Sequence, residues 1–132
     1  MHRMNVLLSV ALLSSLVAGC KDSGTEPDTT PPPAVGGSVS FSGRILPTFT
    51  SFGCTGCHGG TSGLTVTSVA SLLAGGTHGA AVIPGDAPNS ILYKKLLATP
   101  PFGVRMPEGG PYLPDSTIAA IATWINEGAK NN

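Results

Sequence analysis

Two cysteines and a histidine stand together near the middle of this 132-residue chain, in the run Cys54-Thr55-Gly56-Cys57-His58. The spacing puts two thiols three positions apart on one tight turn, with an imidazole directly after the second thiol. In an exported protein, two free thiols this close would oxidise unless something occupied them. Any fold proposed for the chain must therefore explain what this short segment holds.

The pattern C-x-x-C-H is the one through which c-type haem is attached to protein. Two thiols on a tight turn can form thioether bonds to the two vinyl groups on one side of a porphyrin, and His58 is then placed to offer an imidazole nitrogen to the iron. The ring must be neutral, and its other nitrogen must donate to a carbonyl or a water. We therefore predict one haem c, bound covalently at Cys54 and Cys57, with His58 as the proximal iron ligand. The sequence does not identify the acceptor of the ring N–H.

Three other interpretations of the motif remain open at this point. A zinc ion would need four ligands, which Cys54, Cys57, His58 and His78 could supply, although adjacent Cys57 and His58 rarely both reach one tetrahedral ion. A thioredoxin-like redox pair would follow a strand and open a helix, whereas here a helix is expected before the motif and a Gly59-Gly60 turn after it. A disulfide between the two cysteines would close a very small loop, with little stabilisation to gain.

The N-terminal segment predicts export. Its first five residues carry a positive charge and precede an apolar run from Val6 to Val17, which is too short for a transmembrane helix and fits the apolar region of a signal peptide. Small residues then lead to Cys20, an arrangement that resembles the lipobox of bacterial lipoproteins. The resemblance implies cleavage after Gly19, lipidation of Cys20 and a lipid anchor in the cell envelope, facing the periplasm or on the outer membrane or surface. An ordinary signal cleaved near Ala18, with Cys20 as a spare thiol, is the alternative.

The remainder divides into a tether and one domain. Residues 20–39 contain a proline triplet and almost nothing to bury, so they predict a flexible tether. Residues 40–132 predict a single folded domain around one haem.

Residues 37–132 carry five basic and four acidic side chains with no block of one sign. A polyanion-binding protein would need a basic stripe, so nucleic acid is not an expected partner.

Hydrophobic spacing predicts an all-α domain with long loops. The expected helices are Ser42–Phe52, Ser68–Ala74, Ala87–Ala98 with Asp86 as its cap, and Asp115–Glu127, with glycine stops after the second and the last. Pro47 predicts a late start or a kink in the first helix, Leu64–Thr67 is expected to be irregular or extended, and Phe102–Pro114 is expected to be a loop.

One Trp, two Tyr and four Phe make a thin core. A buried macrocycle would supply the missing apolar mass, so the haem-free protein is expected to fold poorly.

Met106 is the predicted distal ligand, because it lies in a proline- and glycine-rich loop between two expected helices. The alternative for Met106 is a gap-filling core methionine. His78, in a glycine-rich turn, is expected to face solvent, and it would matter only in a bis-histidine site. Trp124, Tyr93 and Arg105 could each reach haem propionates, although core packing is favoured for Trp124. Lys94 and Lys95 are expected on a solvated helix face.

These residues carry a resemblance to a known family. The domain from about Ser40 to Ala129 resembles the planctomycete-type cytochrome c domain, which is related to class I cytochromes c. The resemblance rests on the following segments: Ile45-Leu46-Pro47, Cys54 to Gly59, Gly63-Leu64, Gly75-Gly76, Pro84-Gly85-Asp86, Ser90 to Leu92, Arg105-Met106-Pro107, Leu113 and Trp124 to Ala129. It implies haem attachment at Cys54 and Cys57 and axial ligation by His58 and Met106. Two departures are Pro114, where a capping residue such as serine is expected, and His78, which replaces a residue that is usually not histidine.

The sequence therefore predicts a membrane-tethered, monohaem one-electron carrier that serves redox partner proteins and is not an enzyme. Its carboxylates are scattered and no nucleophile has an evident partner. The alternative from another class is a haem-based sensor of a gas or peroxide, in which Met106 is absent from the iron and the sixth position is open. A weaker alternative is a haem-free, zinc-binding or structural lipoprotein.

Overall fold

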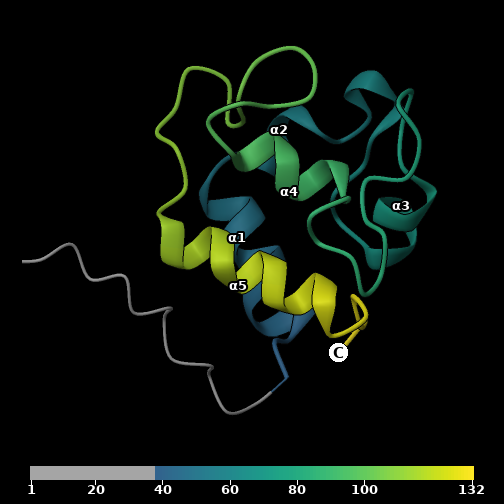
Figure 1. The fold of residues 1–132 in the computed structure, drawn as a ribbon. Coiled ribbons are helices and arrows are strands. Elements are labelled where there is room, and N and C mark those ends of the chain that lie inside the picture. The colour runs from purple at the N-terminus through teal and green to yellow at the C-terminus, as the bar shows by residue number, and fades with distance from the viewer. Residues whose placement is uncertain (1–37) are drawn as a thin grey trace, which may run out of the picture. The chain divides into compact units, whose positions relative to one another are not determined.

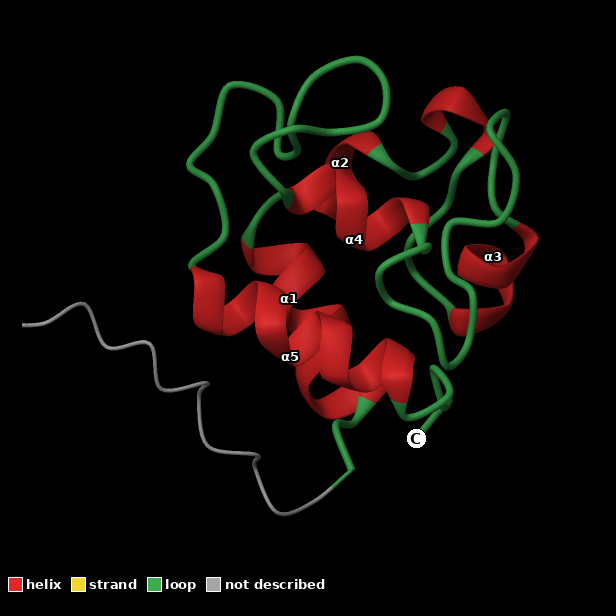
Figure 2. Cartoon of the chain, in the orientation of Figure 1, coloured by secondary structure: helices red, strands yellow, loops and turns green. Residues whose placement is uncertain are grey.

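The computed structural model describes residues 38–132, and over these residues it is a helical domain without strands (Figures 1 and 2). The elements in chain order are the π-helix η1 (Phe41–Ile45), α1 (Leu46–Ser51), α2 (Cys54–Cys57), the 3₁₀ turn η2 (Thr61–Gly63), α3 (Val69–Ala74), α4 (Ile91–Leu96) and α5 (Asp115–Asn126). The prediction of an all-α fold with long loops is confirmed. The predicted signal peptide, Cys20 and nearly all of the predicted tether lie outside the described residues.

None of the helices within residues 38–132 combines the length and the apolar character that crossing a membrane would require.

The first helix begins with a wide turn and continues as an α-helix. The turn closes through a hydrogen bond from Leu46 N to Phe41 O, five residues back. Pro47, in the first turn of α1, has no N–H with which to bond the carbonyl of Gly43 in an α-helical ladder. The irregularity that Pro47 predicts therefore lies directly before it, and η1 and α1 together cover nearly all of the expected range Ser42–Phe52.

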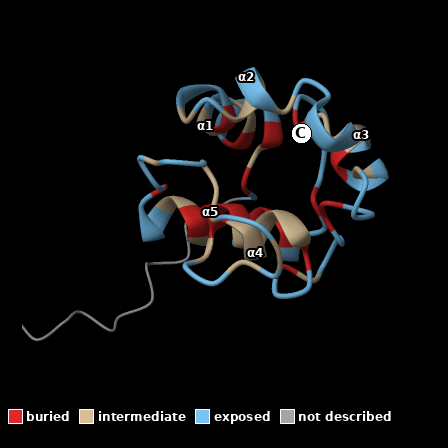
Figure 3. Cartoon of the chain, turned by 90° about the horizontal axis from the view of Figure 1, so that it is seen from above, coloured by how far each residue is buried: buried red, intermediate tan, exposed pale blue. Residues whose placement is uncertain are grey.

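A large part of the apolar core lies between this first segment and α5. Its buried side chains there are Phe41, Ile45, Phe49, Ile118, Ile121, Trp124 and Ile125. The rings of Phe41 and Trp124 have centroids 5.4 Å apart. Trp124 Nε1 donates to Lys130 O at 2.9 Å, so the core-packing interpretation of Trp124 is confirmed and its ring N–H is already bonded. Figure 3 shows the middle of α5 as buried.

Hydrogen bonds join the two ends of the described chain. Val39 N donates to Glu127 Oε2 at 2.8 Å, beside the C-terminal end of α5. Phe41 N donates to Asn132 Oδ1 at 3.0 Å, and Ser42 N donates to Asn132 O at 2.9 Å. These bonds fix the start of the first helix next to the end of α5, and the first helix in turn delivers the chain to Cys54.

The predictions for α3 and α5 are confirmed nearly to the residue, because each helix carries local start or stop signals. Ser68 caps α3 by accepting from Ser71 N at 3.1 Å. Gly75, with φ +76°, ends that helix. Gly128, with φ +98°, follows the end of α5, where the sequence places its stop.

The prediction for α4 is wrong at both ends, since the helix runs only from Ile91 to Leu96. Asp86 caps a turn instead of the helix: its carboxylate accepts from Asn89 N at 3.2 Å and from Asn89 Nδ2 at 2.8 Å. Ala87 N donates to Asn126 Oδ1 at 2.9 Å, a bond that ties this turn to α5. At the other end, Leu97 is already extended.

Ser90, which precedes α4, is fully buried and holds the turn before it. Its hydroxyl accepts from Ile83 N at 2.8 Å and donates to Asp86 O at 2.8 Å. One hydroxyl therefore bonds two backbone groups of the turn before α4, the N–H of Ile83 and the carbonyl of Asp86.

We expect Ser90→Ala to lower the free energy of unfolding by about 1–3 kcal/mol, because the Ile83 N–H would lose its acceptor inside the protein. Chemical denaturation of the two proteins measures the difference. Ser51→Ala is the matched control, since Ser51 is exposed at the end of α1, and a change of less than about 0.5 kcal/mol is expected there. Equal effects at the two positions would contradict the structural role assigned to Ser90.

Candidate functional site

The two cysteines lie on the one-turn helix α2. Gly53, with φ +72°, ends the preceding helix, and His58 N donates to Cys54 O at 2.8 Å to close the turn. Cys54 is half-buried, Cys57 is exposed, and both thiols are free. Burial raises the pKa of the Cys54 thiol above its ordinary value, against a lowering backbone hydrogen bond, and Cys57 adds a smaller increase. Because both thiols are free, Cys54 and Cys57 form no disulfide in the structure.

His58 follows this turn with its ring in the interior of the domain. Its backbone is held by a hydrogen bond from Val66 N to His58 O at 3.1 Å and by the adjacent bridge between Gly59 and Thr65. The ring atom Nδ1 is buried and has no hydrogen-bond partner among residues 38–132. An unpartnered buried ring nitrogen costs free energy unless another group satisfies it. The acceptor that the sequence leaves open is not found within the described part of the chain.

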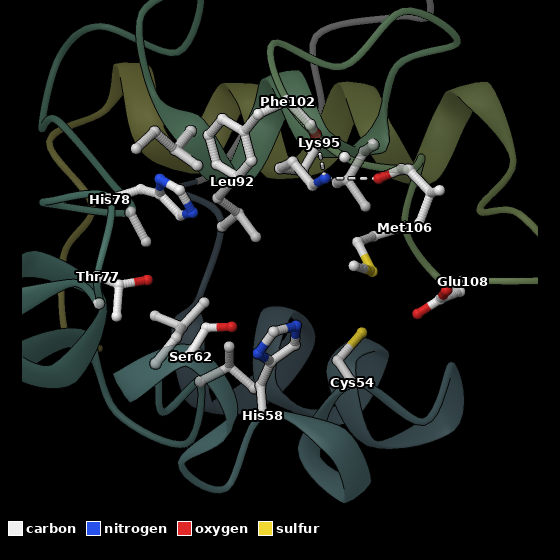
Figure 4. Close-up of a pocket in the computed structure, with 18 of the residues that line it drawn as sticks. Cys54, His58, Ser62, Thr77, His78, Leu92, Lys95, Phe102, Met106 and Glu108 are labelled. Carbon is white, nitrogen blue, oxygen red and sulfur yellow. Dashed lines mark hydrogen bonds between the residues drawn. The ribbon is translucent and has the colours of Figure 1, made fainter.

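A cavity of about 420 Å³ adjoins Cys54 and His58, within the size range of small-molecule and cofactor sites. Its apolar lining includes Phe49, Leu64, Val66, Leu92, Leu96 and Leu113. Five of its polar lining residues are Ser62, Thr77, His78, Lys95 and Glu108. Figure 4 shows Cys54 and His58 projecting from one wall, with Lys95, Phe102 and Met106 on the facing side.

Met106 reaches this cavity from the loop between α4 and α5. Its side chain is half-buried and lines the cavity, and its backbone N donates to Lys95 O at 2.8 Å. Residues 102–114 contain no helix, as the sequence predicts. The structure therefore brings three of the predicted haem-site residues, Cys54, His58 and Met106, to one cavity. Cys57 is not among the residues that line it.

Lys95 was not recognised as a cavity residue from the sequence, and its predicted place on a solvated helix face is wrong. It is half-buried and lines the cavity, with its ammonium 4.8 Å from the centroid of the Phe102 ring. The signal was present, because Lys95 lies three and four positions after Leu92 and Ile91, which also line the cavity. Helical spacing thus places Lys95 on the same face of α4 as these two apolar residues. The expectation of a solvent-exposed side chain came from its charge alone.

His78 is exposed, as predicted, but it also lines the cavity. Its ring stacks on the ring of Phe102 with centroids 4.0 Å apart and planes at 25°. This contact joins the turn that carries His78 to the loop that carries Met106. The sequence contains no periodic pattern that links positions 78 and 102.

Tyr93 and Arg105 line a separate hollow of about 320 Å³, together with Leu97, Asp115 and Ile118. Arg105 Nε donates to Leu96 O at 2.8 Å, and the guanidinium lies 4.2 Å from the centroid of the Tyr112 ring. Neither Tyr93 nor Arg105 is among the residues that line the larger cavity. Arg105 thus has two local partners, Leu96 O and the Tyr112 ring.

The donor set of the larger cavity fits a c-type haem. A neutral imidazole and a thioether are the usual axial donors of a cytochrome c iron, and both line a cavity that also contains the Cys54 thiol. The cavity is also mainly apolar, as a site for a buried macrocycle must be. For zinc the fit is poor, because within residues 38–132 no three His, Cys, Asp or Glu side chains gather closely enough to hold a metal ion.

His78 reaches the cavity wall from a tight turn, and this turn is formed by glycines. Gly76 N donates to Gly79 O and Gly79 N to Gly76 O, each at 3.0 Å. Gly75 has φ +76° and ψ −152°, a conformation essentially restricted to glycine. A Cβ at position 75 would lie 1.8 Å from Gly79 O, whereas a Cβ at position 79 would meet no atom within 4 Å.

We expect Gly75→Ala to lower the free energy of unfolding by at least about 2 kcal/mol more than Gly79→Ala, because the first adds a backbone collision to the strain of a positive φ. Gly79, with φ +92°, supplies the strain alone. Denaturant unfolding of both variants tests this difference. If the two variants were equally stable, the close approach of the backbones at position 75 would be refuted.

Comparison with known proteins bears on the segment that contains the site. No curated protein and no solved structure matches the chain. A family model does match, over a shorter range than the resemblance seen in the sequence: it begins at Cys54 and excludes both the first helix and α5. Residues 54–108, which contain Cys54, Cys57, His58 and Met106, match the family described as planctomycete cytochrome C.

Proposed function

We propose that this chain is a monohaem c-type cytochrome that carries single electrons. The observation that carries the proposal is that Cys54, His58 and Met106 line one mainly apolar cavity and that all three lie in the segment that matches planctomycete cytochrome C. Cys54 and Cys57 would hold the haem through thioether bonds. His58 and Met106 would be the axial donors, on the proximal and distal side respectively.

The bound haem would supply one chemical property, the change of its iron between the ferric and ferrous states. The chain's residues set the conditions for that change. A neutral His58 and a thioether from Met106 favour the ferrous state relative to two imidazoles and so raise the potential. The apolar side chains around them exclude water and lower the local dielectric constant, which also tunes the potential. Their packed positions keep rearrangement small when the charge changes.

We favour a carrier over an enzyme on the make-up of the cavity wall. Among the described lining residues Glu108 is the one carboxylate, and it is exposed. His58 is assigned to the iron, and His78 is stacked on Phe102. With Cys54 in a thioether bond and His58 on the iron, the wall would offer no free nucleophile beside a general base, which group-transfer or hydrolytic chemistry requires.

The proposal extends to the cell envelope. The signal-like N-terminus and the lipobox-like segment before Cys20 support export and a lipid anchor, in the periplasm-facing or outer membrane. Residues 20–39 would then tether the domain to the membrane while it exchanges electrons with redox partner proteins. Labelling of cells with a radioactive fatty acid, compared with Cys20→Ala, tests the anchor.

We expect Met106→Ala to keep its covalent haem and to lose the near-infrared absorption band of the ferric protein that reports a methionine–iron bond. His78→Ala is the matched control, because His78 lines the same cavity and should leave the band intact. Absorption spectra of the ferric and ferrous proteins measure both effects. A five-coordinate wild-type iron that binds carbon monoxide would favour a sensor, and loss of the band in His78→Ala alone would contradict Met106 as the ligand.

We expect the double variant Cys54→Ala, Cys57→Ala to lose covalent haem entirely, since each thioether needs its own thiol. Mass spectrometry of the denatured exported protein measures this: the wild type should carry the added mass of one haem, and the double variant none. Each single variant should retain one thioether and a shifted ferrous spectrum. Wild-type protein without haem, in a host that matures c-type cytochromes, would overturn the proposed function.

A further inference from the structure

The loop that carries Met106 is fastened to the end of α4. Lys95 Nζ donates to Phe102 O at 2.7 Å and also to Val104 O. Met106 N donates to Lys95 O at 2.8 Å. A single residue of α4 thus binds the loop through its side chain at two positions and through its carbonyl at a third.

The surroundings of the ammonium strengthen these bonds. Lys95 is half-buried in a mainly apolar wall, and hydrogen bonds from a charged donor are about twice as strong as neutral ones. The ammonium also lies 4.8 Å from the centroid of the Phe102 ring, whose other neighbour is the stacked ring of His78. Figure 4 shows the Lys95 ammonium beside Phe102 and Met106 along the same side of the cavity.

Apart from Lys95, the stack of the Phe102 ring on His78 attaches this loop to the rest of the domain. Residues 102–110 contain no helix, and Gly103, between the two bonded carbonyls, has φ +55°. Val104 is 50% exposed, so its side chain contributes little packing. Arg105 provides a further attachment through its bond to Leu96 O, also at the end of α4.

We propose that Lys95 is a positioning residue, which holds the Phe102–Met106 segment so that the Met106 thioether stays at the iron. This inference rests on the proposed function, since it assumes a haem with Met106 as its distal ligand. Fixing the segment beforehand lowers the entropy cost of ligation, and an external ligand must then compete with a pre-organised thioether. Lys95 therefore controls how readily the sixth position opens.

The experiment uses the exported holoprotein and imidazole as the competing ligand. Lys95→Leu keeps an apolar side chain and removes the ammonium; we expect it to bind imidazole to the ferric form about tenfold more tightly, with a weakened methionine–iron band, because two charge-assisted hydrogen bonds are lost. Lys94→Leu removes the same charge from the neighbouring position, whose side chain makes no hydrogen bond among the described residues, and should change imidazole affinity less than about twofold. Lys95→Arg restores a cationic donor and should recover most of the wild-type affinity.

The outcomes separate this inference from the proposed function. Covalent haem with a methionine band in the wild type supports the proposed function, whatever the variants do. Equal imidazole affinity in wild type and Lys95→Leu, with the band unchanged, overturns the role of Lys95 alone, as does an equal effect of Lys94→Leu. If Lys95→Leu yields no folded holoprotein, Lys95→Gln keeps a donor on a shorter side chain and should tighten imidazole binding about threefold; no change there overturns the inference equally.

Discussion

The structure depends on one geometric constraint: the one-turn helix α2 and the residue after it must present a thiol and an imidazole to an apolar cavity that shares its walls with the core. Phe49 shows how closely the two are joined, because it is buried in the core with 1% exposure and also lines the cavity. Leu96 and Leu113 are likewise buried in the core and also line the cavity. A haem in the cavity would therefore extend the hydrophobic core directly, and stability and cofactor binding would be properties of the same side chains.

The parts of the fold that the sequence predicts are those whose signals are local. Ser68 and Gly75 bound α3 from within a few residues, and Gly128 ends α5 in the same way. The turn before α4 could not be predicted, because it is held by a bond from Ile83 N to Ser90 Oγ and by a bond from Ala87 N to Asn126 Oδ1, 39 residues away. Such bonds depend on tertiary packing, which a capping pattern at Asp86 does not reveal.

The same distinction between local signals and tertiary packing applies to the residues of the site. A five-residue motif identifies Cys54, Cys57 and His58, and loop composition singles out Met106, so sequence alone names the residues that the structure then places around the cavity, Cys57 apart. What it misses is how the wall is assembled. Lys95 faces the cavity although it is charged, and His78 meets Phe102 across 24 residues of chain. A long lysine can bury its stem and still satisfy its ammonium on carbonyls, which composition does not predict.

The two sides of the cavity differ in how firmly their backbones are held, and this difference bears on function. The His58 side is fixed by the turn of α2 and by bonds from Gly60, Leu64 and Val66 around it. The Met106 side is a loop without regular structure, attached at the end of the six-residue α4. Local opening begins in segments with few buried contacts. Met106 therefore lies on the less firmly held side of the cavity, and its loop is kept in place there by hydrogen bonds to Lys95 of α4.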